Sequence, residues 1–202
     1  MTAVSFPKDD NITYLFLDWG EIGALTQLLA GKILLSNTTP YDRLIALATG
    51  GHTMSKAIKD YLNIKKSSSM QISFYTDIEK TNKTPIITQS IGADIQNERV
   101  LIFDDVNDSG QTLKIADSYL RMRGVVSIDT ACLLQKPTTS FPSTYYGEET
   151  KSWIIFPDEV RETITSLTSR WRKQNLPQEA IRKRLLEIGF SETHLNLIET
   201  YP

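Results

Sequence analysis

The sequence has little of what marks a secreted, membrane-spanning or nucleic-acid-binding protein. It has one cysteine in 202 residues, so no internal disulfide can form. No window approaches the ~20 apolar residues of a membrane span, and residues 1–10 lack the apolar stretch of a signal peptide. The formal net charge of -2 lacks the basic excess of a general nucleic-acid binder. These absences favour a cytoplasmic enzyme and argue against a membrane or nucleic-acid partner.

The usual motifs for nucleotides and calcium are missing as well. Neither GxxxxGK[ST] nor GxGxxG occurs. An EF-hand loop beginning at Asp105 would require a glutamate at its twelfth position, which is Ala116, so calcium is not expected. Cys132 lies in an apolar run, which indicates a buried core residue rather than a reactive thiol. Any ligand site must therefore be found from other patterns.

Apolar runs alternate with helical patterns along most of the chain. The patterns predict strands at 14–17, 44–48, 70–75, 100–103, 125–134 and 153–156, and helices at 21–30, 53–62 and 112–122. This alternation predicts an α/β fold with a central, mainly parallel sheet flanked by helices. Ligands of such sheets bind beyond the carboxyl ends of the strands, so we expect the chemistry in the loops after these strands.

Two stretches depart from the alternation. Residues 77–98 are polar with few core-forming runs, which is typical of a lid or binding loop, or of a solvated hairpin. From Val160 onward the chain looks helical, with breaks near 175–177 and at Gly189. We therefore expect one domain over residues 1–160 and a helical C-terminal extension over residues 161–202.

The strongest signal is VLIFDDVNDSGQT, residues 100–112, in which an apolar strand runs into two acids and then a helix start. Asp104 and Asp105 are paired acceptors, suited to the adjacent hydroxyls of a ribose. Free N–H groups at a helix start favour a phosphate, Gly110 allows close approach, and Ser109 and Thr112 add hydroxyl donors. A turn of this composition also occurs without any ligand, so spacing alone leaves both interpretations open.

This segment resembles the motif of the type I phosphoribosyltransferases that binds phosphoribosyl pyrophosphate (PRPP), at all thirteen positions. The resemblance implies the same parallel-sheet fold with a flexible hood over the site. It implies that Asp104 and Asp105 contact the ribose of PRPP and, mostly indirectly through PRPP, Mg²⁺. It also implies that the 5′-phosphate is held by Asp108, Ser109, Gly110, Gln111 and Thr112.

Further parts of the chain resemble the same family in order and spacing. LIALATGG, residues 44–51, resembles the loop whose backbone binds pyrophosphate, so Thr49, Gly50 and Gly51 become candidate PRPP contacts. Many relatives carry Arg or Lys where this chain has Thr49. Residues 77–98 take the place of the hood, from which Lys80 or Lys83 would reach the pyrophosphate; simple solubility explains these lysines equally well.

The stretch KPTTSFPSTYYGEETKSWIIFP resembles the xanthine- and hypoxanthine-type enzymes of this family. The resemblance implies that Lys136 donates to a purine 6-oxo group, Trp153 stacks on the base, and the Ile154 backbone reads its edge. Glu159 would approach the 2-position or a metal-bound water. A tryptophan often stands in relatives where this chain has Asp158. Taken alone, a Trp–Ile pair is more often core, and a Lys–Pro pair is usually a surface turn.

The expected function is therefore transfer of ribose 5-phosphate from PRPP to a base, forming a nucleoside 5′-monophosphate and pyrophosphate. The implied base is a 6-oxopurine (hypoxanthine, xanthine or guanine), the cofactor Mg²⁺, and the acid/base group Asp108, acting at the purine N7. Two alternatives stay open: a PRPP-sensing regulatory protein that uses its helical tail, where basic and acidic residues are mixed, and an enzyme for a pyrimidine or other base. A homo-oligomer also stays open.

Overall fold

The computed structural model describes residues 2–6, 10–36, 39–76 and 83–200. Contacts divide the chain into two compact units, one made of residues 1–22 and 151–202 and the other of residues 23–150. The boundary at residue 160 expected from the sequence stays a prediction about domains. No helix within the described ranges is long and apolar enough to cross a membrane.

The unit of residues 23–150 is built on a six-stranded sheet in the order β5-β4-β3-β6-β7-β8. Its strands are β3 (Arg43–Ala48), β4 (Lys66–Thr76), β5 (Lys83–Gln89), β6 (Arg99–Asn107), β7 (Ser127–Gln135) and β8 (Tyr145–Glu149). All neighbours run parallel except β5, which pairs with β4 as an antiparallel edge strand. The sheet is therefore mainly parallel, as the sequence predicts.

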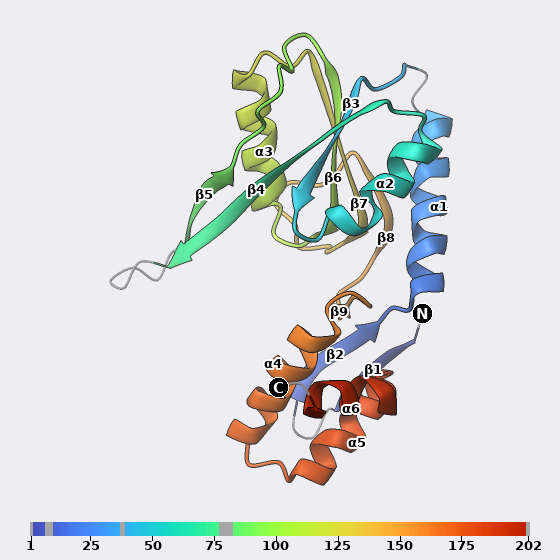
Figure 1. Cartoon of the computed structure of the whole chain (residues 1–202), viewed down its shortest axis with the longest axis vertical. Helices are drawn as coiled ribbons and strands as arrows, with labels where there is room; N and C mark the ends of the chain where they lie inside the picture. Colours follow the sequence, from blue (N-terminus) through green and yellow to red (C-terminus); the bar gives the residue numbers. More distant parts are fainter. Residues whose placement is uncertain (1, 7–9, 37–38, 77–82, 201–202) are drawn as a thin grey trace. The chain divides into compact units, whose positions relative to one another are not determined.

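Helices lie on both faces of this sheet: α3 (Gln111–Met122) on one, α2 (His52–Tyr61) and α1 (Trp19–Ser36) on the other (Figure 1). Leu113, Ala116 and Leu120 of α3 pack in one core cluster with Ile45 and Ile102 of the sheet. Because both faces are covered, β3 and β6 are buried on both sides, which explains their continuous apolar sequences.

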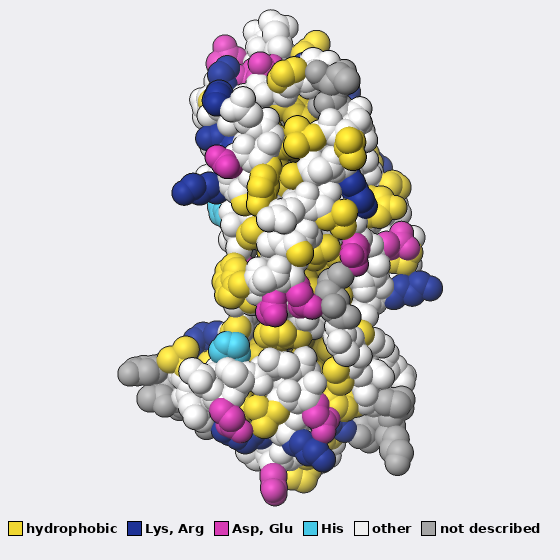
Figure 2. Space-filling view, turned by 90° about the vertical axis from the view of Figure 1, so that its right-hand side faces the viewer, with side chains coloured by type: hydrophobic (Ala, Val, Ile, Leu, Met, Phe, Trp, Pro, Cys, Tyr) yellow, Lys and Arg dark blue, Asp and Glu magenta, His cyan; other side chains and the backbone are white. Residues whose placement is uncertain are grey.

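Helix α1 carries exposed apolar side chains. Leu28, Leu34 and Leu35 are exposed, Leu35 by 90%. Figure 2 shows hydrophobic side chains on the face of the molecule that includes this helix. Exposed leucines of this kind are ordinary on a protein surface.

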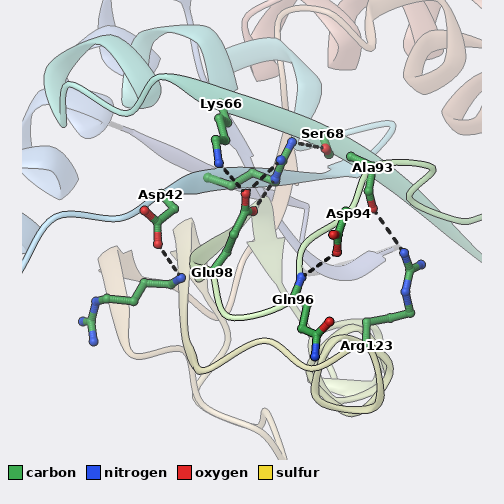
Figure 3. A network of polar contacts seen from close by, with 10 residues as sticks. Asp42, Lys66, Ser68, Ala93, Asp94, Gln96, Glu98 and Arg123 are labelled. Atoms are coloured by element: carbon green, nitrogen blue, oxygen red, sulfur yellow. Dashed lines mark hydrogen bonds and ion pairs between the residues drawn. The ribbon is translucent and has the colours of Figure 1, made fainter.

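The amino ends of three strands are joined by an ion network in which Arg43 and Glu98 are buried and Lys66 is exposed (Figure 3). Glu98, just before β6, accepts hydrogen bonds from Arg43 at 2.6 and 3.0 Å and from Lys66 at 2.7 Å. Arg43 begins β3 and Lys66 begins β4, and Arg43 also donates to Ser68 at 2.9 Å. The hydrogen bonds from Arg43 are the main reason that the pKa of Glu98 is lowered. This network aligns the strands at the end opposite to their carboxyl termini.

The other unit combines a three-stranded sheet with three helices. Its sheet has the order β1-β2-β9, from β1 (Ala3–Phe6), β2 (Asp10–Phe16) and β9 (Trp153–Ile155). The helices are α4 (Val160–Lys173), α5 (Gln178–Ile188) and α6 (Glu192–Thr200). Trp171 is fully buried at the centre of their shared core. Its indole donates to Asp10, whose buried carboxylate also pairs with Arg170.

The elements differ from the sequence-based expectation in three ways. The strands predicted at 14–17 and 153–156 pair with each other, as β2 and β9, and lie outside the main sheet, so the expectation that they belong to one central sheet is wrong. The strand predicted at 100–103 continues to Asn107, so both acids lie on β6. Three short strands, β1, β5 and β8, were not predicted as such, and β5, which pairs antiparallel with β4, occupies part of the stretch 77–98 for which a lid loop and a solvated hairpin were both open. The helical tail and its breaks are confirmed.

Candidate active site

The end of β6 holds two adjacent carboxylates. Asp104 and Asp105 are both half-buried, and each accepts a hydrogen bond from the next backbone N–H, at 3.0 and 2.6 Å. Burial raises the pKa of Asp104 well above its usual range, and the neighbouring Asp105 carboxylate raises it further. Two acids held this close resist carrying two full charges, so the pair favours hydroxyl donors or a cation beside it.

The turn after β3 lies directly against this pair. A Cβ added to Gly50 would collide with the Asp105 carboxylate, and one added to Gly51 would lie 2.6 Å from the carbonyl oxygens of Leu47 and Phe103. Thr49 is exposed, and the peptide bond that precedes it is cis. The structure therefore brings together the two loops that the sequence marks as candidate PRPP contacts.

Helix α3 begins immediately after β6 through Gly110. This glycine has φ +83°, and a Cβ there would lie 2.5 Å from the Phe141 backbone nitrogen and 2.7 Å from Thr139 Oγ1. No side chain caps the helix by hydrogen bonding at this residue. Asp108 and Ser109 are exposed beside the helix start. Such a helix start is suited to an anion, because its first N–H groups point outward.

The side chains at the remaining positions of this helix start differ in exposure. Gln111 is exposed and Thr112 is half-buried. Both lie in the first turn of α3, where the sequence expects a phosphate to bind.

A buried amide network ties the end of β6 to the loop after β7. Asn107, 2% exposed, donates through Nδ2 to the Phe141 carbonyl at 2.9 Å and to Ser143 Oγ at 3.0 Å. Its Oδ1 accepts from Thr139 Oγ1 at 3.1 Å. Gln135 completes the network by accepting from the Ser143 N–H at 2.8 Å. Sequence reasoning missed Asn107 and Gln135, because their only signal is a polar type at the end of an apolar strand.

Lys136 follows directly after this network. Its backbone N–H donates to the Asn107 carbonyl at 2.9 Å, which fixes where the side chain starts. Burial lowers the pKa of Lys136, and the negative charge of Asp108 acts in the opposite direction. The structure thus brings two sequence-predicted residues, Lys136 and Asp108, within electrostatic range of each other.

The other predicted base-binding residues belong to the second compact unit. Trp153 lies on β9 opposite Tyr14 and is 53% exposed, while Ile154 is half-buried. Glu159 is the N-cap of α4, and its backbone N–H donates to Phe156 at 3.1 Å. An exposed indole is available to stack on a planar ligand. The roles of these three residues stay predictions.

Cys132 is buried, as its sequence context predicts. It is a free cysteine inside β7, and burial raises the pKa of its thiol to about 12. A thiol held protonated in this way is not a nucleophile near neutral pH. The two lysines predicted to reach pyrophosphate are not placed: Lys80 lies outside the described residues, and so does the side chain of Lys83.

Comparisons with known proteins agree with this arrangement. Residues 16–164 match the family model of the phosphoribosyl transferase domain. The chain is 26% identical over 159 residues to a xanthine-guanine phosphoribosyltransferase of Gluconobacter oxydans, covering 78% of this chain and 90% of that protein. It is 38% identical over 90 residues to a hypoxanthine-guanine phosphoribosyltransferase of Staphylococcus epidermidis, covering 43% and 46%. A purine phosphoribosyltransferase structure from Pyrococcus horikoshii superposes with a TM-score of 0.64 at 32% identity, covering 71% and 92%.

Proposed function

The chain belongs to the phosphoribosyl transferase family, and on that premise we propose that it is a purine phosphoribosyltransferase of nucleobase salvage. It forms a nucleoside 5′-monophosphate and pyrophosphate from PRPP and a 6-oxopurine. One observation carries the proposal: the end of β6 places two carboxylates against the Gly50 turn and leads directly into the start of α3. A sugar that carries phosphates at two positions needs these three features side by side.

Each part of PRPP has a matching group in this proposal. The Asp104 and Asp105 carboxylates accept hydrogen bonds from the ribose hydroxyls. The start of α3, from Asp108 to Thr112, holds the 5′-phosphate through backbone N–H groups and hydroxyls, and Gly110 lets the chain turn there. Thr49, Gly50 and Gly51 present backbone to the pyrophosphate. Each hydrogen bond to a charged group contributes about 1.5–3 kcal/mol.

Mg²⁺ fits this site as an ion shared with the substrate. No cluster of three or more His, Cys, Asp or Glu side chains able to hold a metal was found among the described residues. Asp104 and Asp105 offer a pair of carboxylates, to which the many oxygens of PRPP add ligands. Mg²⁺ bound in this way would offset the charge of the leaving pyrophosphate.

The chain's own residues then act on the base. Lys136 donates to the 6-oxo oxygen, and a charged donor there disfavours a 6-amino purine. Trp153 stacks on the ring, the Ile154 backbone contacts its edge, and Glu159 approaches its 2-position. As the base nitrogen bonds to C1 of the ribose, the bond to pyrophosphate breaks, and Asp108 accepts the proton that the purine N7 loses.

A panel of bases tests the proposal. The protein is incubated with PRPP, Mg²⁺ and hypoxanthine, xanthine, guanine, adenine or a pyrimidine, and release of pyrophosphate and nucleotide is measured. We expect turnover with the 6-oxopurines. PRPP binding without turnover of any base would favour the sensor alternative and refute the enzyme.

Lys136→Met tests the choice of base. It removes a charge-assisted hydrogen bond and should raise the KM for hypoxanthine about 10- to 100-fold. Lys114→Met removes an exposed lysine of α3 and serves as the control. If adenine and hypoxanthine react alike both with and without Lys136, the assignment of the base is wrong.

A further inference from the structure

The three C-terminal helices enclose a groove that the proposed reaction does not use. Its volume is about 630 Å³, and every lining residue comes from α4, α5 or α6 (Figure 1). A small-molecule site typically measures about 300–1,000 Å³, so the groove has room for an organic ligand. None of its lining residues is among those assigned to PRPP or the base.

The groove has an apolar floor. Ile164, Leu185 and Leu195 line it, and each is less than a tenth exposed because it also belongs to the core of this unit. These residues are held by the packing around Trp171 and do not depend on a ligand for their position. A preformed apolar floor favours a ligand with an apolar body.

The rim of the groove is positively charged. Arg161, Arg172, Lys173 and Arg182 line it, and no Asp or Glu is among the lining residues. Intramolecular hydrogen bonds orient two of the arginines: Arg172 donates to Gln178 at 2.8 Å, and Arg182 donates to Asn196 at 3.1 Å. Arg182 also pairs with Glu192, so its charge is partly offset.

The other two cations keep their donors available. Within the described part of the chain, the side chains of Arg161 and Lys173 have neither a hydrogen bond nor an ion pair. Both lie on α4, and the exposed hydroxyl of Thr165 lies on the same helix and also lines the groove. A guanidinium binds carboxylate or phosphate oxygens in pairs, so Arg161 is the cation suited to hold the anionic group. Lys173 ends α4, about 18 Å further along the helix axis at a rise of about 1.5 Å per residue, and adds positive charge at the other end of the rim.

We propose that this groove is a binding site for a small organic anion, with the apolar body on the floor and a carboxylate or phosphate at the Arg161 side of the rim. Charge complementarity selects the occupant, because four cations surround an apolar surface that carries no acid. An uncharged apolar molecule would leave these cations unused, and an inorganic anion would leave the floor exposed to water.

Two fluorescent probes test the site on the full chain. Anilinonaphthalene sulfonate combines an aromatic body with an anion, whereas N-phenyl-1-naphthylamine has a similar body without charge. We expect the charged probe to bind one site per chain, and saturating PRPP to leave this binding unchanged. Displacement of the probe by PRPP would place it in the active site and overturn the proposal.

Variants locate the probe. Arg161→Gln should weaken the charged probe about three- to tenfold and change the uncharged probe less than about twofold, and Lys173→Gln, at the other end of α4, should have the smaller effect on the charged probe. Lys183→Gln removes one charge from α5 outside the groove and should change neither. Thr168→Trp fills the groove and should abolish binding of both, with circular dichroism checking the fold. Equal binding of the charged probe to the wild type and to Arg161→Gln would refute the site.

Competition identifies the anion. Hexyl phosphate and hexanoate share an apolar chain and differ in their charged group. Displacement of the sulfonate probe by either supports the site, and the stronger competitor names the preferred group. Failure of both at millimolar concentration would refute binding of an organic anion.

Discussion

Asn107 connects the proposed sugar-phosphate loop to the proposed base loop, and we expect Asn107→Ala to damage both stability and base binding. The side chain makes four hydrogen bonds of 2.9–3.3 Å, to Phe141, Ser143, Thr139 and Gln135. It is 2% exposed, so the substitution leaves its partners in a buried gap that water fills poorly. At about 0.5–1.5 kcal/mol for each net hydrogen bond, the loss is about 2–6 kcal/mol of unfolding free energy.

The assay separates folding from positioning. Urea unfolding measures the loss of stability, provided that the unfolding free energy depends on urea concentration with the same slope in both proteins. Initial rates give the KM for hypoxanthine and the KM for PRPP separately. The backbone bond between Lys136 and Asn107 survives the substitution, so the variant should fold. A loosened loop misplaces the Lys136 side chain, and KM for the base should rise about tenfold while KM for PRPP changes much less.

Neighbouring threonines grade this effect. Thr139→Val removes one of the four hydrogen bonds and should cost about 1 kcal/mol. Thr138→Val alters the exposed residue before Thr139 and should leave the free energy of unfolding unchanged. If Asn107→Ala unfolds at the wild-type urea concentration and keeps the wild-type KM for hypoxanthine, the network does not hold the loop.

Three further substitutions test other parts of the structure. Gly110→Ala places a methyl group 2.5 Å from the Phe141 nitrogen at φ +83°, so KM for PRPP should rise at least about tenfold, whereas Gly92→Ala, with nothing within 4 Å, should leave it unchanged. The pKa of Glu98 is lowered in the folded protein, chiefly by Arg43, so this residue stabilises the fold above its ordinary pKa of 4.5 and loses that contribution as pH falls through the lowered value. The difference in unfolding free energy between wild type and Glu98→Gln, read from urea midpoints, should therefore shrink from about pH 7 to pH 3; a constant difference contradicts the ion network. Asp108→Ala should keep the wild-type melting temperature and lower kcat about 10²–10⁴-fold, and unchanged turnover would exclude its acid/base role.

The sequence predicts the central sheet because strands that are buried on both faces have continuous apolar sequences. β3 and β6 are read from continuous apolar runs, and α2 and α3 from apolar residues at helical spacing. β1, β5 and β8 have no such pattern, because they are short or polar, and each is completed by pairing with the strand next to it in the chain. Their existence depends on partners that a local pattern does not contain.

For a similar reason, the sequence did not predict which strands belong to which of the two sheets. The segment Trp153–Ile155 looks like any short buried strand, and only its pairing with β2 places it outside the main sheet. An apolar pattern predicts that a strand is buried, but it does not identify the strands with which it pairs. The roles predicted for Trp153 and Glu159 therefore rest on family resemblance and not on the geometry of the β6 loop.

The sequence identifies the candidate site through residues expected to contact a ligand. The shape of the site depends on other residues, which are not expected to contact the ligand. Asp104, Asp105 and Lys136 are visible in sequence because their charges are unusual after apolar strands. Gly50 and Asn107 place them, the first by having no Cβ where the Asp105 carboxylate lies and the second by holding the base loop with buried hydrogen bonds. Because such contacts join segments far apart in sequence, no local pattern predicts them. Substitutions at these supporting positions should therefore change substrate KM values, whereas a substitution at Asp108 should change mainly kcat, and the two classes are separable by kinetics.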